Sequence, residues 1–124
     1  MKKTLALISL LALPAVMPLL SAASVLAANV ASNMGDLSQY QTIASDALAL
    51  IEKNDIAGAQ KRITDFETAW DAGQPTLYYK DKKAWGFVDD AADGAISSLR
   101  AKKPDAAKAK AAVKNLIAKM KNPS

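Results

Sequence analysis

One run of apolar side chains at helical spacing restricts the fold of this chain more than any other feature. The run steps forward by three, four, three and four positions, through Ile56, Ala59, Ile63, Phe66 and Trp70. This is the seam spacing with which helices pack nearly antiparallel to one another. The segment therefore predicts a core-facing helix that Asp55 caps and that Gly73 and Pro75 end.

Three further segments carry one apolar face at the same spacing. They predict helices from Asp36 or Ser38 to about Lys53, from Asp81 to Leu99, and from Pro104 to Lys121. Asn54 is predicted to stop the first helix in a left-handed conformation. No alternating strand pattern competes. We therefore expect an all-α, up-down-up-down antiparallel four-helix bundle over residues 36–121.

The segments between these helices are predicted to be irregular. Residues 28–35 are small and polar, and we expect them to be disordered, while Thr76 to Lys80 is expected to form a loop. Gly86 and Gly94 lie inside the third helix, where glycine is unfavourable. We interpret both as points where a neighbouring element comes close.

The first 27 residues have the layout of an export signal. Two lysines precede an apolar run at 5–20 that two prolines interrupt, and small residues lead to Ala27. We predict cleavage after Ala27 or Ala28 and a periplasmic location. The alternative is a retained membrane anchor, because residues 5–28 are long enough to span a bilayer. The prolines and the small residues favour cleavage.

The chain contains no histidine and no cysteine. A histidine-based catalytic triad, a haem held by histidine, a thiol nucleophile and a thiolate metal site are therefore excluded. There is also no phosphate-binding loop. We expect neither an enzyme nor a haem cofactor. Nucleic acid is not expected as a partner, because the chain has an export signal and its aromatic residues are not interleaved with its lysines.

Residues 66–93 hold six of the seven aromatic residues. Antiparallel second and third helices would bring Trp70 and Trp85 together, close to Tyr78 and Tyr79. One interpretation is an aromatic plug that closes an end of the bundle. The other is an aromatic pocket in which these four residues bind a small cationic ligand, since ring faces attract positive charge.

The same stretch offers two pairs of carboxylates one helical turn apart, Glu67 with Asp71 and Asp89 with Asp93. If the two helices pack side by side, the four groups would converge. Calcium and magnesium accept such all-oxygen ligands, so a divalent cation remains possible. The alternative is a solvated acidic face, paired with Lys82, Lys83, Arg100 or the lysines of the last helix.

Positive charge is concentrated at the end of the chain. From Arg100 onward there are eight basic residues and one acidic residue, Asp105. The basic helix can lie against an acidic body, or it can contact an anionic surface. The second interpretation assigns that contact to Lys103, Lys108, Lys110, Lys114, Lys119 and Lys121.

Two tryptophans, each followed by acidic residues at fixed spacing, form the most distinctive pattern. Glu67-x-x-Trp70-Asp71 is followed by Trp85-x-x-Val88-Asp89-x-x-x-Asp93 and, seven residues later, by Arg100. This order resembles small exported bacterial helical-bundle proteins of unassigned activity. The resemblance implies a periplasmic bundle and assigns no catalytic residue.

Two functions are compatible with these features. The first is a non-catalytic periplasmic binding or interaction module, which holds a small cationic ligand, a metal ion or an envelope partner at the aromatic and acidic end. The second is a structural, envelope-associated protein whose basic C-terminal helix contacts anionic surfaces such as a membrane. The sequence leaves the oligomeric state open.

Overall fold

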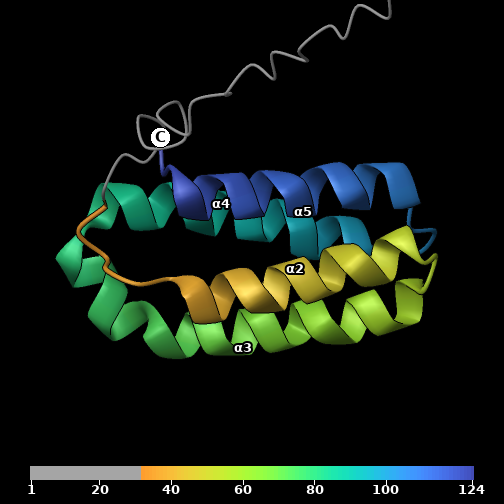
Figure 1. Cartoon of the computed structure of the whole chain (residues 1–124), viewed down its shortest axis with the longest axis horizontal. Coiled ribbons are helices and arrows are strands. Elements are labelled where there is room, and N and C mark those ends of the chain that lie inside the picture. Colours follow the sequence, from red (N-terminus) through yellow and green to blue (C-terminus); the bar gives the residue numbers. More distant parts are fainter. Residues whose placement is uncertain (1–31) are drawn as a thin grey trace, which may run out of the picture.

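The computed structural model describes residues 32–124. Over these residues it contains four helices and no strand: α2 (Ser38–Glu52), α3 (Ile56–Lys80), α4 (Lys82–Arg100) and α5 (Ala106–Lys121) (Figure 1). The predicted all-helical fold is confirmed. The predicted export signal and residues 28–31 lie outside the described part of the chain. None of the described helices combines the length and the apolar character that a membrane crossing requires.

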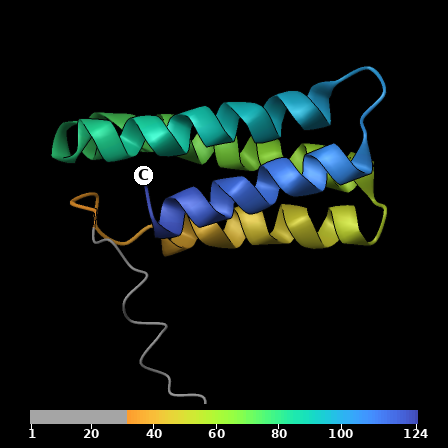
Figure 2. The ribbon, with the colours of Figure 1, turned by 90° about the horizontal axis from the view of Figure 1, so that it is seen from above.

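The four helices close a ring around a single core. α2 packs against α3 and α5, and α4 also packs against α3 and α5 (Figures 1 and 2). The connections from α2 to α3 and from α4 to α5 lie at one end, whereas the α3–α4 junction and the C-terminus lie at the other (Figure 1). This arrangement brings distant parts of the chain together at both ends.

The core contains the apolar faces that the sequence predicts. Its largest fully buried side chains are Trp70, Phe66, Met34, Ile63, Leu99, Leu116, Val88 and Val113. Burying a side chain of this size stabilises a fold by about 1.5–3 kcal/mol. Among the described residues, no Asp, Glu, Lys or Arg side chain is buried. The carboxylates, ammonium groups and guanidinium groups therefore lie at or near the surface.

Aspartates cap three of the helices, as expected from their free backbone amides. Asp55 accepts a hydrogen bond from the Gly58 amide, and Asp81 accepts one from the Ala84 amide. Asp105 accepts from the first turn of α5. Asn54 has a φ of 61°, which confirms the predicted left-handed stop after α2.

The predicted end of the second helix is wrong. α3 continues through Gly73 and Pro75 to Lys80, so residues 76–80 are helical rather than a loop. Pro75 cannot donate the hydrogen bond that an amide would make there. Leu77, which is 6% exposed, packs into the core two residues later, and its burial offsets that loss. The last part of α3 bends away from the line of the first part (Figure 1).

The interpretation of the two glycines in α4 is also wrong. A Cβ atom placed on Gly86 or on Gly94 would meet nothing within 4 Å. The close approach occurs at Gly73 instead, where a Cβ would collide with the Tyr40 hydroxyl and lie 3.2 Å from Leu77 Cδ1. The glycine that the helix packing requires is therefore the one that was predicted to end a helix.

Part of the segment that was predicted to be disordered is packed. Met34 is 2% exposed and belongs to the core, and Leu37 is buried beside the start of α2. The Asn33 amide donates a hydrogen bond of 3.3 Å to Asp81 at the α3–α4 junction. Apolar burial thus holds residues 32–37 against one end of the bundle.

Gly73 and Gly94 form a matched pair for mutation. We expect Gly94→Ala to raise the free energy of unfolding by about 1 kcal/mol, because alanine is the better helix former and space is open. Gly73→Ala should lower it by about 1–3 kcal/mol, because it overpacks the contact with Tyr40. Urea denaturation followed by circular dichroism measures both changes. Equal effects of the two substitutions would contradict the packing described at Gly73.

Candidate functional site

The two indole rings meet between α3 and α4. Trp70 and Trp85 are stacked with ring centroids 5.9 Å apart and an interplanar angle of 10°, which confirms that the two tryptophans come together. Trp70 is 2% exposed, whereas Trp85 is only partly buried. Phe66 stacks on Trp70 from within the core at 5.9 Å, and Tyr40 contacts it edge-on at 5.3 Å. The pair therefore joins the core to the surface.

The predicted tyrosines extend this row of rings outward. Tyr78 meets Trp85 edge-on at 5.4 Å, and Tyr79 meets Tyr78 edge-on at 5.3 Å. Tyr79 is 75% exposed. The side chain of Lys82 places its Nζ 5.5 Å from the centre of the Tyr78 ring, within the range of a cation–π contact. All four predicted aromatic residues therefore belong to one row, and one of its outer rings already attracts a cation.

A carboxylate of α4 is tied to the buried indole. Trp70 Nε1 donates a hydrogen bond of 3.1 Å to Asp89 Oδ1. Burial raises the pKa of Asp89 above its ordinary value, and the charges of Asp93, Asp90 and Asp71 add to that effect, while the indole hydrogen bond opposes it. The folded protein therefore holds a carboxylate whose negative charge is poorly compensated.

Three carboxylates cluster on the exposed side of α4. Oxygens of Asp89, Asp90 and Asp93 lie within 4.8 Å of one another. None of the three, nor Asp71, forms an ion pair with a described residue. Asp90 was not among the predicted ligands, although it follows Asp89 directly and precedes Asp93 by almost one helical turn. Helical spacing alone would have found it.

Glu67 does not join this cluster. Its two carboxylate oxygens accept hydrogen bonds of 2.9 and 3.0 Å from the guanidinium group of Arg100, in the paired geometry that arginine favours. Asp71 is exposed, and it affects Asp89 through its charge. Of the four carboxylates predicted to hold a metal, Glu67 is therefore in an ion pair, Asp89 and Asp93 belong to the acidic cluster, and Asp71 belongs to neither.

The Trp85 indole N–H is the unsatisfied polar group at this site. Trp85 Nε1 is buried and has no hydrogen-bond partner among the described residues. A buried donor without an acceptor costs about 1–3 kcal/mol. This part of the bundle therefore holds carboxylates without an ion-pair partner and an indole donor without an acceptor among the described residues.

The lysines predicted to contact an anionic surface do not form one free face. Lys103 lies in the connection before α5. Like Lys108, Lys114 and Lys121 of that helix, it is exposed and forms no ion pair with a described residue. Lys110 pairs with Glu52 at 3.7 Å. Lys119 lies over the Phe87 ring at 5.7 Å and donates to the carbonyl oxygen of Ser124. With about 100° between successive helical residues, Lys110, Lys114 and Lys121 lie toward α2 and Lys108 and Lys119 toward α4.

A cavity of about 240 Å³ lies elsewhere, at the start of α4. It is lined by Ser32, Asp81, Lys83, Ala84, Phe87, Pro123 and Ser124. Asp81 is already engaged there, because it caps α4 and accepts the Asn33 amide. The cavity therefore does not coincide with the tryptophan pair, and its one acidic side chain is already hydrogen-bonded to backbone amides.

Comparison with protein-family models, with curated proteins and with solved structures gives no match. The resemblance to small exported bacterial helical proteins therefore stays a prediction. The geometry of the chain itself carries the functional argument.

Two substitutions at Asp89 separate its charge from its hydrogen bond. Asp89→Asn keeps an acceptor for Trp70 Nε1 and removes the charge, whereas Asp89→Ala leaves the indole donor without a partner. We expect Asp89→Ala to lower the free energy of unfolding by about 1–3 kcal/mol, and Asp89→Asn to be neutral or stabilising at pH 7.

The stability of these variants should depend on pH in a defined direction. The pKa of Asp89 is raised above 3.8, so at pH values just above 3.8 the folded state keeps the proton on Asp89 more than the unfolded chain does. The parent therefore loses free energy of unfolding as the pH rises from 3.8 through the pKa of Asp89 in the folded state. Any gain in the free energy of unfolding of Asp89→Asn over the parent should therefore disappear below about pH 3.8. Urea denaturation at several pH values measures it, and a pH-independent difference would contradict the assignment.

Proposed function

We propose that this chain is a non-catalytic binding module of the periplasm, which binds a small cationic ligand beside the Trp70–Trp85 pair. One observation carries the proposal. Asp89, Asp90 and Asp93 converge and have no ion-pair partner among the described residues, and Asp89 accepts a hydrogen bond from Trp70, whose ring stacks on Trp85. A bound cation would relieve the repulsion between these charges.

The chemistry of the site favours a cation over an anion or an apolar ligand. Burial and neighbouring carboxylates both make the charge of Asp89 unfavourable, so a positive ligand gains more here than at a solvated aspartate. The faces of Trp85 and Tyr78 attract positive charge, with cation–π contacts worth about 0.5–2 kcal/mol. Lys82 already occupies such a position over Tyr78, which supports this preference.

The remaining parts of the proposal rest on the sequence. The absence of histidine and cysteine supports a role without catalysis. The N-terminal layout supports an export signal that is cleaved after Ala27 or Ala28. Short connections at alternating ends support an up-down-up-down antiparallel topology.

The alternative function is contact of the basic C-terminal helix with an anionic surface. The contacts of α5 support it less than the contacts around Asp89 support the cation site. Lys110 and Lys119 are engaged within the bundle, and the lysines lie on two sides of α5. The helix therefore offers fewer free charges in one direction than its sequence suggests.

Tryptophan fluorescence provides the test of cation binding. Titration with spermidine and, separately, with calcium chloride at low ionic strength should change the emission of the tryptophan pair in a saturable way. Asp89→Asn combined with Asp93→Asn should weaken the binding of the effective probe by about tenfold or more, equivalent to at least about 1.4 kcal/mol.

The matched control is Asp65→Asn, which neutralises an exposed carboxylate that pairs with Arg62 away from the cluster. This variant should bind like the parent. If neither probe changes the emission, or if the control weakens binding as much as the double variant, the proposed site is wrong. A response to calcium alone would identify a metal ion as the ligand.

A further inference from the structure

A second charged region lies at the opposite end of the bundle and is independent of the cation site. We infer that this end binds an anionic lipid surface. Its free charges belong to four parts of the fold: the α2–α3 turn, the start of α3, the α4–α5 connection and the start of α5. We call this region the basic end and define it by Lys53, Lys61, Lys102, Lys103 and Lys108, all of which are exposed.

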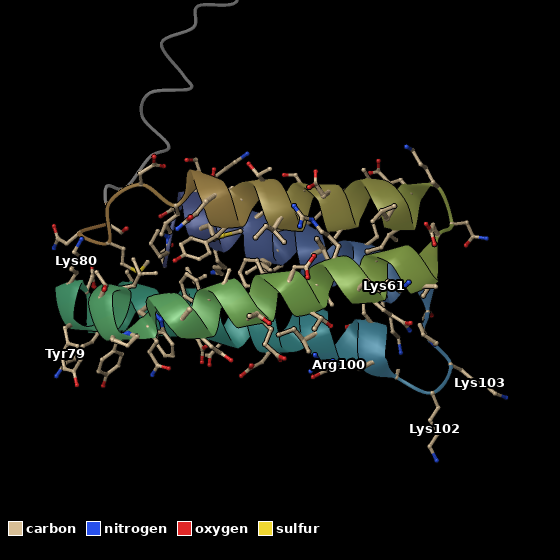
Figure 3. The ribbon with its side chains drawn as sticks, turned by 90° about the horizontal axis from the view of Figure 1, so that it is seen from below. Lys61, Tyr79, Lys80, Arg100, Lys102 and Lys103 are labelled. Carbon is tan, nitrogen blue, oxygen red and sulfur yellow. The ribbon has the colours of Figure 1, made fainter. Side chains whose placement is uncertain are left out.

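Contacts between distant residues bring these lysines together. Gln60 Nε2 donates a hydrogen bond of 2.8 Å to the carbonyl oxygen of Leu99, which places Lys61 near the end of α4. Figure 3 shows Lys61, Arg100, Lys102 and Lys103 at one end of the molecule and Tyr79 and Lys80 at the other.

The remaining two lysines reach the same end through α2 and α5. The ion pair of 3.7 Å between Glu52 and Lys110 joins the end of α2 to the first turns of α5. Lys53 follows Glu52 directly, and Lys108 precedes Lys110 by two residues. These contacts therefore place the five lysines around the end of the bundle that carries the α2–α3 and α4–α5 connections.

The acidic residues at this end are already in use. Glu52 pairs with Lys110, and Glu67 pairs with Arg100. Asp55 and Asp105 accept hydrogen bonds from the amides of the helices that they cap. In contrast, the five lysines of the basic end form no ion pair with a described residue. Their charge is therefore available to an external partner.

The type of residue present favours a lipid surface over a shaped anionic ligand. Both arginines of the chain, which would give paired recognition of a phosphate, are held by carboxylates. The aromatic residues that would stack on nucleobases lie away from this end, as the row from Phe66 to Tyr79 shows. Flexible lysines without a fixed geometry match a diffuse array of headgroup charges.

The test compares two double variants with the same change in charge. Lys102→Gln with Lys103→Gln alters the basic end, and Lys114→Gln with Lys121→Gln alters two exposed lysines on the α2 side of α5. Protein purified from cells that express the full 124-residue chain is sedimented with vesicles. The vesicles contain phosphatidylcholine alone or phosphatidylcholine with phosphatidylglycerol.

We expect binding only to the anionic vesicles, with loss of binding in about 0.5 M salt. The Lys102/Lys103 variant should bind about 30-fold more weakly, because each lysine near an anionic surface contributes about 1 kcal/mol. The Lys114/Lys121 variant should bind within about twofold of the parent, because those lysines lie further along α5 from the basic end and salt screens distant charges. Circular dichroism shows whether both variants remain folded. Their tryptophan fluorescence should respond to spermidine or calcium as that of the parent does.

Several outcomes would overturn the inference. If the two double variants bind anionic vesicles equally weakly, the contact involves the whole of α5 rather than the basic end. Salt-independent binding, or binding to phosphatidylcholine alone, would show that apolar insertion rather than the lysines holds the protein. Absence of binding to anionic vesicles would dismiss the proposal, as would tighter binding to duplex DNA at the same salt concentration. None of these outcomes changes the result of the cation titration.

Discussion

The burial of Trp70 is the constraint on which this end of the structure depends. Its ring needs a large apolar environment, which Phe66, Tyr40 and Trp85 supply, and its indole N–H needs an acceptor. Asp89 is that acceptor. A carboxylate is thereby drawn toward the core, where its charge is less favourable and its pKa is raised. The acidic site is thus partly a consequence of how the core satisfies one tryptophan.

The distribution of charge follows from which groups the fold uses internally. At the basic end, carboxylates cap helices or form ion pairs, and lysines remain without described partners. On α4 the opposite holds, because Asp89, Asp90 and Asp93 have no ion-pair partner among the described residues. A chain with a modest net charge therefore has two regions of opposite sign.

Local sequence rules correctly predicted the features that depend on neighbouring residues. They failed for features that depend on packing between residues far apart in the sequence. The seam from Ile56 to Trp70 and the stop at Asn54 were predictable, because each reflects helical spacing or backbone preference within one segment. The helix end at Pro75 was not, because the burial of Leu77 outweighs the missing hydrogen bond. Asp90 could have been found from spacing. The sequence offered Arg100 as one of several possible partners for the carboxylates, and only the packing of α3 against α4 selects Glu67 as its partner.

The sequence by itself determined the four apolar helical faces, the lack of histidine and cysteine chemistry, and the concentration of aromatic and acidic residues in one stretch. Only the tertiary structure decided which charges are neutralised and which remain free. The physical reason is that helical periodicity acts over a few neighbouring residues. Ion pairs and indole contacts, in contrast, depend on the side chains that another helix brings within a few ångströms, as Arg100 does for Glu67 and Asp89 for Trp70.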